Sequence, residues 1–357
     1  MENKKDIRDL TSEELKTFFA EKGMQAFRAK QVDEWLWKKS ARSFAEMSNL
    51  SKETRAILED NFTFNAVTVD SVQTSSDRTI KSAMKLYDGN IVEGVLIPTL
   101  TRITACISSQ VGCSLTCKFC ATGKLKRVRN LDAAEMYDQV AIIAKQAMDN
   151  YKIPLTNIVY MGMGEPLLNY ANMMESVRRI TSPEGLGMSP QRITVSTAGI
   201  AKMIKKLGDD QVKFNLALSL HAANDEKRSK IMPINEENSL DALAEALNYF
   251  TEKTGERVTF EYIIFKDFND KTKDAQELVD FVKRTKAKVN IIEYNPIDNG
   301  EYQQTSDSRL KTFVEHLEQH HVIVNVRRSR GKDIDAACGQ LANKNKLGLE
   351  TRILKTV

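Results

Sequence analysis

The chain has 357 residues, a formal net charge of +4, 41% hydrophobic residues and 28% charged residues. These values are ordinary for a globular protein with one large domain and appendages, or with two domains. No apolar run approaches the length of a membrane span, and the start of the chain is charged, unlike a signal peptide. We therefore expect a cytoplasmic protein with no membrane partner. We also expect a monomer, because nothing in the sequence suggests an obligate dimer.

The cysteines are clustered, and their number is odd. Four of the five lie between Cys106 and Cys120, which fits a reducing compartment better than a disulfide scaffold. Cys113, Cys117 and Cys120 have the spacing C-x-x-x-C-x-x-C. Three thiolates this close in sequence can hold three corners of a cubane iron–sulfur cluster. The fourth iron would then be open to a non-protein ligand, which indicates chemistry at the iron rather than electron transfer alone.

The spacing alone leaves two other interpretations open. Cys106 could join the other three cysteines in a structural zinc site, although such sites more often use two separated C-x-x-C pairs. The cysteines could also be free thiols buried in the core as small hydrophobic side chains.

Residues 1–62 are expected to form an N-terminal helical domain. Its basic residues could bind an RNA backbone, and they include Arg28, Lys30, Lys38 and Lys39. Thr11 and Glu14 form a capping-box pattern, and Gly23 is a plausible helix end. The next predicted helix covers 26–39. It should bring four side chains near one face, and we expect its aromatic residues in the core rather than stacked on bases: Phe27, Val32, Trp35 and Leu36.

Residues 63–98 are expected to form a small β adaptor. Strand-forming runs cover 67–73, 79–87 and 91–97, with a hairpin turn at 88–90. Glu93 stands between apolar neighbours in the last run, and the pattern alone favours a solvent-facing side chain.

From residue 99 to 330 apolar strands alternate with helices, which indicates parallel strands joined by right-handed crossovers. The strands are expected at 102–109, 157–162, 192–197, 214–220, 258–265, 289–294 and 322–326. The clearest helices are expected at 132–149, 169–181, 240–253, 271–286 and 307–320. Six βα units predict an open, partial (β/α)6 barrel of the TIM type, and residues 331–357 would form a C-terminal tail.

Candidate binding residues follow the predicted strands. The cysteine loop follows the first strand, and GMGEPLLN (162–169) follows the second. Other polar residues stand at the ends of later strands: Ser196, Ser219, His221 and Asn295. In barrels of parallel strands the chemistry lies at the C-terminal ends of the strands, so one ligand could contact all of these positions. Each is weak by itself, since His221 alone could be a structural histidine.

Two groups of basic residues suggest contacts with phosphates, although either alone could be an ordinary exposed face. They are Lys118, Lys124, Lys126, Arg127 and Arg129 in the first group, and Arg327, Arg328, Arg330 and Lys332 in the second.

Phe119 completes the pattern C-x-x-x-C-x-aromatic-C, and with it the chain resembles the radical S-adenosylmethionine (radical SAM) enzymes. It resembles more closely the RlmN group, dual-specificity RNA methyltransferases that methylate adenosine at carbon-2. The likeness covers nearly the whole chain and includes VEGVLIP, CISSQVGC, SLHAANDEKR and the terminal RGKDIDAACGQLA. The related carbon-8 enzymes share most of these motifs, and Pro166–Leu167 follows the carbon-2 group.

The resemblance implies two cofactors. Cys113, Cys117 and Cys120 would hold a [4Fe–4S] cluster, and the amino and carboxylate groups of S-adenosylmethionine (SAM) would bind its open iron. Gly164 and Glu165 would bind the amino end of SAM. The rest of the SAM pocket would be formed by Ser196, Ser219, Leu220, His221 and Asn295.

The resemblance also implies a route that consumes two SAM molecules per turnover. One methylates Cys338, and the second is cleaved to a radical that activates this methyl group for addition to the adenine ring. Glu93 would accept the ring proton, and Cys106 would release the product by forming a transient disulfide with Cys338. The route suits the target, because carbon-2 of adenine is a poor nucleophile and a thiolate is a good one.

The implied substrates are one adenosine of 23S rRNA, in the peptidyl-transferase region, and the adenosine 3′ to the anticodon of certain tRNAs. A reductant such as flavodoxin would supply electrons. Three alternatives are a carbon-8 RNA methyltransferase, a zinc-stabilised RNA-binding protein without catalysis, and a radical SAM activase that acts on protein. The last would leave Cys338 without a role.

Overall fold

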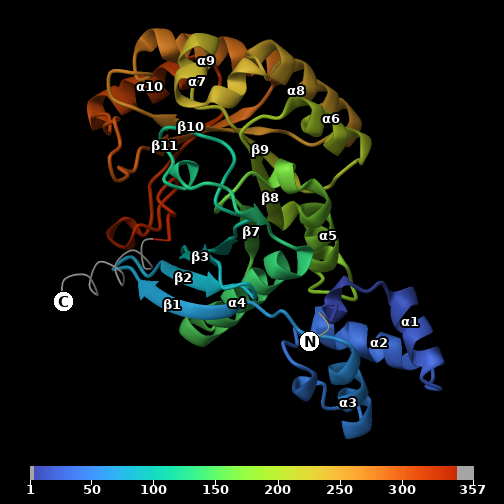
Figure 1. Cartoon of the computed structure of the whole chain (residues 1–357). Helices are drawn as coiled ribbons and strands as arrows, with labels where there is room; N and C mark the ends of the chain where they lie inside the picture. The colour runs from blue at the N-terminus through green and yellow to red at the C-terminus, as the bar shows by residue number, and fades with distance from the viewer. Residues whose placement is uncertain (1–3, 344–357) are drawn as a thin grey trace.

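The computed structural model describes residues 4–343 and is built around one curved sheet of ten strands (Figure 1). The strand order is β1-β2-β3-β4-β7-β8-β9-β10-β11-β12. Within the described residues β1 and β12 stand at the two edges and do not pair with each other, so the barrel is open as predicted. The antiparallel strands are β1 (Thr68–Thr74), β2 (Ile80–Lys85) and β3 (Ile91–Pro98). The parallel strands are β4 (Ile103–Cys106), β7 (Asn157–Tyr160), β8 (Ile193–Thr197), β9 (Asn215–Ser219), β10 (Thr259–Ile264), β11 (Lys288–Glu293) and β12 (Val324–Arg327).

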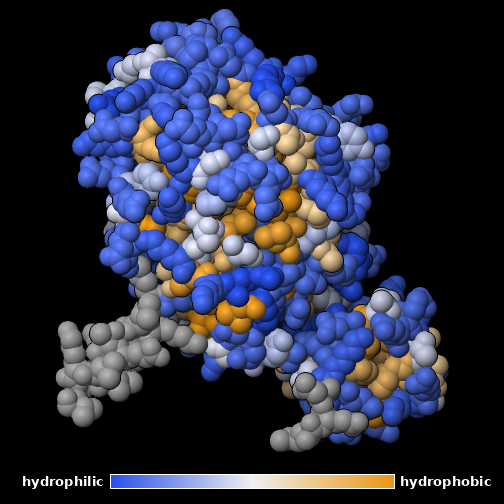
Figure 2. Space-filling view, turned by 45° about the horizontal axis from the view of Figure 1, so that its top comes forward, coloured by the Kyte–Doolittle hydropathy of each residue, from blue (hydrophilic) through white to orange (hydrophobic). Residues whose placement is uncertain are grey.

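Helices cover the outer side of the parallel strands (Figure 1). Five were predicted: α4 (Ala133–Tyr151), α5 (Tyr170–Thr181), α8 (Leu240–Thr254), α9 (Thr272–Thr285) and α10 (Asp307–Gln319). Two shorter helices also alternate with the strands, as expected, although no bounds were predicted for them: α6 (Ala201–Asp209) and α7 (Asp225–Ile231). Hydrophilic side chains dominate the surface, and hydrophobic ones gather in the middle of the face shown in Figure 2. In the range 4–343, none of the helices combines the length and the apolar content that crossing a membrane requires.

The N-terminal helices form a small lobe beside the barrel (Figure 1). They are α1 (Ser12–Glu21), α2 (Phe27–Asp33), a π-helical turn (Glu34–Lys38) and α3 (Lys52–Asn61). The predicted capping box is confirmed, since the Glu14 amide donates to Thr11 Oγ1 at 3.1 Å and the Thr11 amide donates to Glu14 Oε2 at 2.6 Å. The prediction of a core position is wrong for Phe27, which is 49% exposed.

A buried ion-pair cluster joins this lobe to the barrel. The guanidinium of Arg8 donates to Asp6 at 2.9 Å and to Asp138, on α4, at 2.8 Å. The second contact ties the N-terminal lobe to a helix of the barrel. Removing one partner would leave a buried charge unpaired, so the cluster fixes how the lobe is attached.

The expected β adaptor is part of the same sheet, because β3 pairs with β4. The predicted hairpin is confirmed: β2 pairs antiparallel with β3, and Gly89 takes a positive φ of 80° in the turn. The solvent-facing interpretation of Glu93 is wrong, since its side chain is buried at 1% exposure. The second half of the predicted tail, 344–357, lies outside the described residues, and the proposed division into four regions stays a prediction.

Candidate active site

One cavity lies at the C-terminal ends of the parallel strands and brings together most of the predicted site residues. Apolar side chains such as Phe119, Met232 and Ile263 form part of its wall. The predicted residues that line it are Cys113, Cys117, Cys120, Gly164, Glu165, Ser196, Ser219, His221 and Cys338. These positions come from five separate segments of the chain, so the rule about strand ends correctly predicted a shared site.

The strand register explains why distant residues share one face of the sheet. Residues paired side by side point to the same face, as do residues two apart along a strand. Cys106 pairs with Val95 on β3 and with Val159 on β7, so Cys106 and Glu93 share a face. The same row continues through β8 and β9 to Glu261, which pairs with Ser219. Arg327 joins this face through its pairing with Ile292.

The three thiols of the cysteine loop line the same cavity wall. Burial is the main cause that raises the pKa of the Cys113 thiol to about 11 and also raises the pKa values of Cys117 and Cys120. Among residues 4–343 no group of three or more His, Cys, Asp or Glu side chains is arranged to hold a single metal ion. A [4Fe–4S] cluster takes one cysteine thiolate per iron, and all three loop cysteines line the same cavity. The three thiols and their position on the cavity wall therefore fit a [4Fe–4S] cluster.

The GMGEP turn is held tightly against the segment before the cysteine loop. Gly164 has a φ of 98°, and a Cβ atom there would lie 2.5 Å from Cβ of Gln110. The Glu165 amide donates to Gln110 Oε1 at 2.9 Å, and the Glu165 carboxylate accepts from the amide of Ala198 at 2.7 Å. Burial is the main cause of the raised pKa of Glu165. The turn therefore places a buried acidic side chain at the cavity wall, where it can bind an amino group.

Gly164→Ala is expected to lower the activity that the resemblance implies on the order of 100-fold, because the turn must shift by about 1 Å to admit the methyl group. Activity and SAM affinity should both fall, while the iron content stays near the wild-type value. Gly187→Ala is the matched control, since Gly187 also has a positive φ but no atom within 4 Å of its Cβ position. Equal losses in the two variants would contradict this role of Gly164.

His221 and Leu220 have structural contacts. His221 is buried beside Arg228, and burial is the main reason that its pKa falls to about 3, so the ring is neutral at physiological pH. Its Nδ1 accepts the amide of Ile263 at 3.0 Å, and its ring stands edge-on to Phe119 at 4.7 Å. Leu220 packs in the core instead of lining the cavity.

Arg228 does not line the cavity, but it holds two segments that do, and sequence reasoning missed it. It is fully buried, and its guanidinium donates to carbonyl oxygens of Leu220, at 3.1 Å, and Ala198. These contacts join the strand ends that carry the predicted SAM residues. Its place in SLHAANDEKR is the only signal in the sequence, because arginine in a charged run normally lies on the surface.

The tail brings Cys338 to the cavity wall. The carbonyl of Cys338 accepts from Asn295 Nδ2 at 3.2 Å, and the carbonyl of Gly339 accepts the Ala121 amide of the cysteine loop at 2.7 Å. Asn295 does not line the cavity, and its buried Oδ1 has no hydrogen-bond partner within the described residues. Cys338 is an exposed residue that lines the cavity, and desolvation there raises the pKa of its thiol.

Cys106 and Glu93 lie on the inner face but do not line the cavity itself. Burial, and then the negative charge of Cys338, raise the pKa of Cys106 to about 12. Glu93 pairs with the buried Lys81 at 3.2 Å, and its Oε2 accepts the amides of Ala342 at 2.8 Å and Asn343 at 3.1 Å. The tail that carries Cys338 therefore docks on Glu93.

Two family models match the chain. The model described as "Ribosomal RNA large subunit methyltransferase N-terminal domain" matches residues 5–63, and the radical SAM superfamily model matches residues 107–282. A protein of Cytophaga hutchinsonii, called a probable dual-specificity RNA methyltransferase RlmN, is 61% identical over 341 residues. The match covers 96% of this chain and 93% of that relative. The chain belongs to the RlmN family of radical SAM methyltransferases.

Other comparisons agree with RlmN membership. A dual-specificity RNA methyltransferase RlmN of Nitratidesulfovibrio vulgaris is 46% identical, with 94% of both chains covered. The crystal structure of a radical SAM methyltransferase from Sphaerobacter thermophilus matches with a TM-score of 0.90 and 38% identity. It covers 94% of this chain and 99% of that chain. Radical SAM membership implies a [4Fe–4S] cluster and SAM, and the cavity described above is where this RlmN chain has the residues to hold them.

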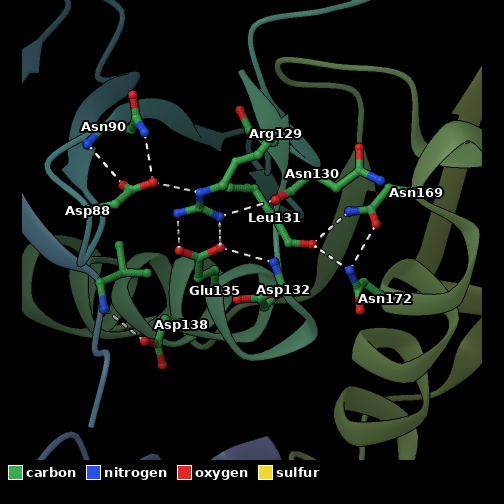
Figure 3. Close-up of polar contacts among 12 residues, drawn as sticks. Asp88, Asn90, Arg129, Asn130, Leu131, Asp132, Glu135, Asp138, Asn169 and Asn172 are labelled. Carbon is green, nitrogen blue, oxygen red and sulfur yellow. Dashed lines mark hydrogen bonds and ion pairs between the residues drawn. The ribbon is translucent and has the colours of Figure 1, made fainter. Parts of the chain in front are cut away.

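A polar network fixes the cysteine loop of this RlmN chain between its neighbours (Figure 3). Arg129, at the end of the loop, donates to Asp88 of the hairpin turn at 2.7 Å and to both oxygens of Glu135, on α4, at 2.7 and 2.8 Å. The carbonyl of Leu131 accepts from Asn169, at the end of the GMGEPLLN segment, at 2.7 Å. The network thus joins the hairpin, the cysteine loop and the predicted SAM turn.

Arg129→Met is expected to lower the free energy of unfolding by about 2–4 kcal/mol, because the buried Glu135 would lose its partner. Burial acts to raise the pKa of Asp88, but hydrogen bonds from Arg129 and Asn90 outweigh it and lower the pKa from 3.8 to about 2. The contribution of Asp88 to stability is therefore full above 3.8 and is lost as the pH falls through about 2. Denaturant titrations over this range should show a weaker acid dependence in Arg129→Met than in the wild type, whereas Arg127→Met should match the wild type, since Arg127 is exposed.

Proposed function

We propose that this chain methylates carbon-2 of adenosine in 23S rRNA and in tRNA, through an S-methylcysteine at Cys338 and with two SAM molecules per turnover. The observation that carries the proposal is that Cys338 faces the same cavity as the three loop cysteines and Glu165. A methyl carrier needs this position, because it must meet SAM first as a thiolate and later as a thioether.

The predicted cofactor-binding residues have separate tasks in this proposal. Cys113, Cys117 and Cys120 would hold the cluster, which supplies the electron for reductive cleavage of SAM. Glu165 would bind the SAM amino group, and Ser196 and Ser219 would bind other polar groups of SAM. The serine hydroxyls lie 3.4 Å apart on neighbouring strands, so both can contact one ligand.

Three residues would carry out the reaction at the adenine ring: Cys338, Glu93 and Cys106. The Cys338 thiolate accepts a methyl group, because sulfur is a far better nucleophile than carbon-2 of adenine. Glu93 takes the proton from carbon-2, and Cys106 attacks Cys338 to free the product. Since the tail amides of Ala342 and Asn343 occupy Glu93 Oε2, the tail must shift before this oxygen can take the proton.

The substrate must present a single unstacked adenine, which favours RNA loops over duplexes. Four of the five basic residues around the cysteine loop are exposed, and they are Lys118, Lys124, Lys126 and Arg127. The second basic group is less available, since Arg328 and Lys332 pair with Glu293. The proposal further includes an N-terminal lobe that contacts RNA, a monomeric state, a cytoplasmic location and a one-electron donor such as flavodoxin.

Nucleoside mass spectrometry of RNA treated with the anaerobically purified enzyme tests the proposal. We expect 2-methyladenosine in 23S rRNA and in tRNA. Formation of 8-methyladenosine would favour the carbon-8 reaction instead. A protein that contains zinc, lacks iron and leaves the RNA unmodified would contradict the proposed activity altogether.

A further inference from the structure

Lys81 is a buried cation of the sheet that the proposed reaction leaves without a role. Its side chain is 4% exposed, and its Nζ lies 3.2 Å from Oε1 of Glu93, whose side chain is 1% exposed. Lys81 and Cys106 both pair with Val95, so Lys81 stands on the inner face that Glu93 shares with Cys106. The positive charge of Lys81 therefore compensates the charge of a carboxylate that has almost no access to water.

The two carboxylate oxygens of Glu93 are held by different parts of the chain. Lys81 reaches Oε1 as an ion pair only, because Oε1 has no hydrogen bond among the described residues. It does so from β2, which pairs with β3 along its whole length. Oε2 instead accepts the amides of Ala342 and Asn343 in the tail. One oxygen thus depends on a strand of the sheet, and the other on a segment that must shift during the proposed reaction.

Lys81 also contacts the tail on the other side of Cys338. Its Nζ donates to the carbonyl of Asp335 at 3.4 Å. The tail is held near this point by a second contact, in which the Gly331 amide donates to Asp77 at 2.9 Å. Both contacts come before Cys338 in the chain, whereas the amides that cover Oε2 come after it. The later part of the tail can therefore leave Oε2 while the earlier part stays attached.

The shift of the tail makes the ion pair decisive for Glu93. A buried carboxylate needs a cation or hydrogen bonds whatever its function. Once the tail amides leave Oε2, the ion pair with Lys81 is the one that remains of the contacts described above. Without Lys81 the uncovered carboxylate would be an unpaired charge inside the sheet, and it would turn away toward water.

We propose that Lys81 is a positioning residue that holds Oε1 of Glu93, so that Oε2 faces the adenine ring once the tail has shifted. This inference rests on the proposed function. In the step that Lys81 serves, the bond between carbon-2 and its hydrogen breaks, and its electron pair stays on the ring. The proton goes to Oε2 of Glu93, and Lys81 itself neither gains nor loses a proton.

The test uses the anaerobic holoenzyme and RNA that carries deuterium at carbon-2 of the target adenosine. Lys81→Met is expected to lower formation of 2-methyladenosine about 100-fold, because a displaced base loses most of its effect. The deuterium isotope effect should rise above the wild-type value, because proton removal becomes the slow step. Methylation of Cys338 by SAM without RNA should keep its wild-type rate, since it does not use Glu93. Lys85→Met is the matched control, because Lys85 is exposed on the same strand.

Lys81→Arg keeps the cation, so it should lose less activity than Lys81→Met and show a smaller rise in the isotope effect. A wild-type isotope effect in Lys81→Met, an equal loss of Cys338 methylation, or an equal loss in Lys85→Met would overturn the inference. If Lys81→Met does not retain iron, Lys81→Arg decides, and a wild-type isotope effect in it overturns the inference. Failure of the proposed function is a different result, in which the wild-type enzyme itself forms no S-methyl-Cys338 and no 2-methyladenosine.

Discussion

Cys117→Ala is expected to abolish RNA methylation and to remove most of the iron from the anaerobically purified protein. Cys117 is the middle cysteine of the loop, and burial keeps its thiol protonated unless a metal takes the proton's place. Two thiolates would remain for a cluster that needs three, so the loop could not retain it. Iron analysis and the visible absorption of the protein measure this loss.

Cys106→Ala is the matched control for the loss of iron, because Cys106 lies on β4 and outside the cysteine loop. It should keep wild-type iron and the visible absorption of the cluster. Full RNA methylation by Cys117→Ala would contradict the assignment of the loop as the cluster site.

Cys106→Ala is also expected to stop turnover after RNA has become attached to Cys338. Cys106 lies on the inner face of the sheet, and the tail carries Cys338 to the cavity on that same side, so we expect the two sulfurs to meet when the tail moves. Without the Cys106 sulfur, no thiolate can attack Cys338 Sγ and release the methylated RNA. Released 2-methyladenosine should fall at least about 100-fold, and a protein–RNA species should accumulate on denaturing gels.

The Cys338→Ala variant distinguishes accumulation of the protein–RNA adduct from a general loss of activity. It should give neither product nor adduct, because it has no methyl carrier. Normal release of product by Cys106→Ala would contradict the resolving role of Cys106, and an adduct in Cys338→Ala would contradict the carrier role of Cys338.

Local patterns in the sequence predicted much of the fold. Thr11 and Glu14 form the predicted capping box at the start of α1. The hairpin turn around Gly89 and the alternation of strands and helices were also confirmed. These features depend on residues a few positions apart, or on the period of one strand or helix, so a single sequence contains their signal.

Other parts of the site depend on pairs that only the folded sheet brings together. Glu93 is buried because Lys81, on the neighbouring strand, and two amides of the tail satisfy its carboxylate. Arg327 meets Glu261 from a position 66 residues away. A charged residue in a short strand normally suggests a solvent-facing side chain, and no local pattern shows that its partner lies across the sheet.

The most direct test of this account uses SAM with an isotopically labelled methyl group in the anaerobic holoenzyme, followed by mass spectrometry of the peptide that contains Cys338. We predict a labelled methyl group on Cys338 before RNA is added, and its transfer to carbon-2 of adenosine afterwards. Labelled 2-methyladenosine formed by an enzyme whose Cys338 never carries the label would contradict the account.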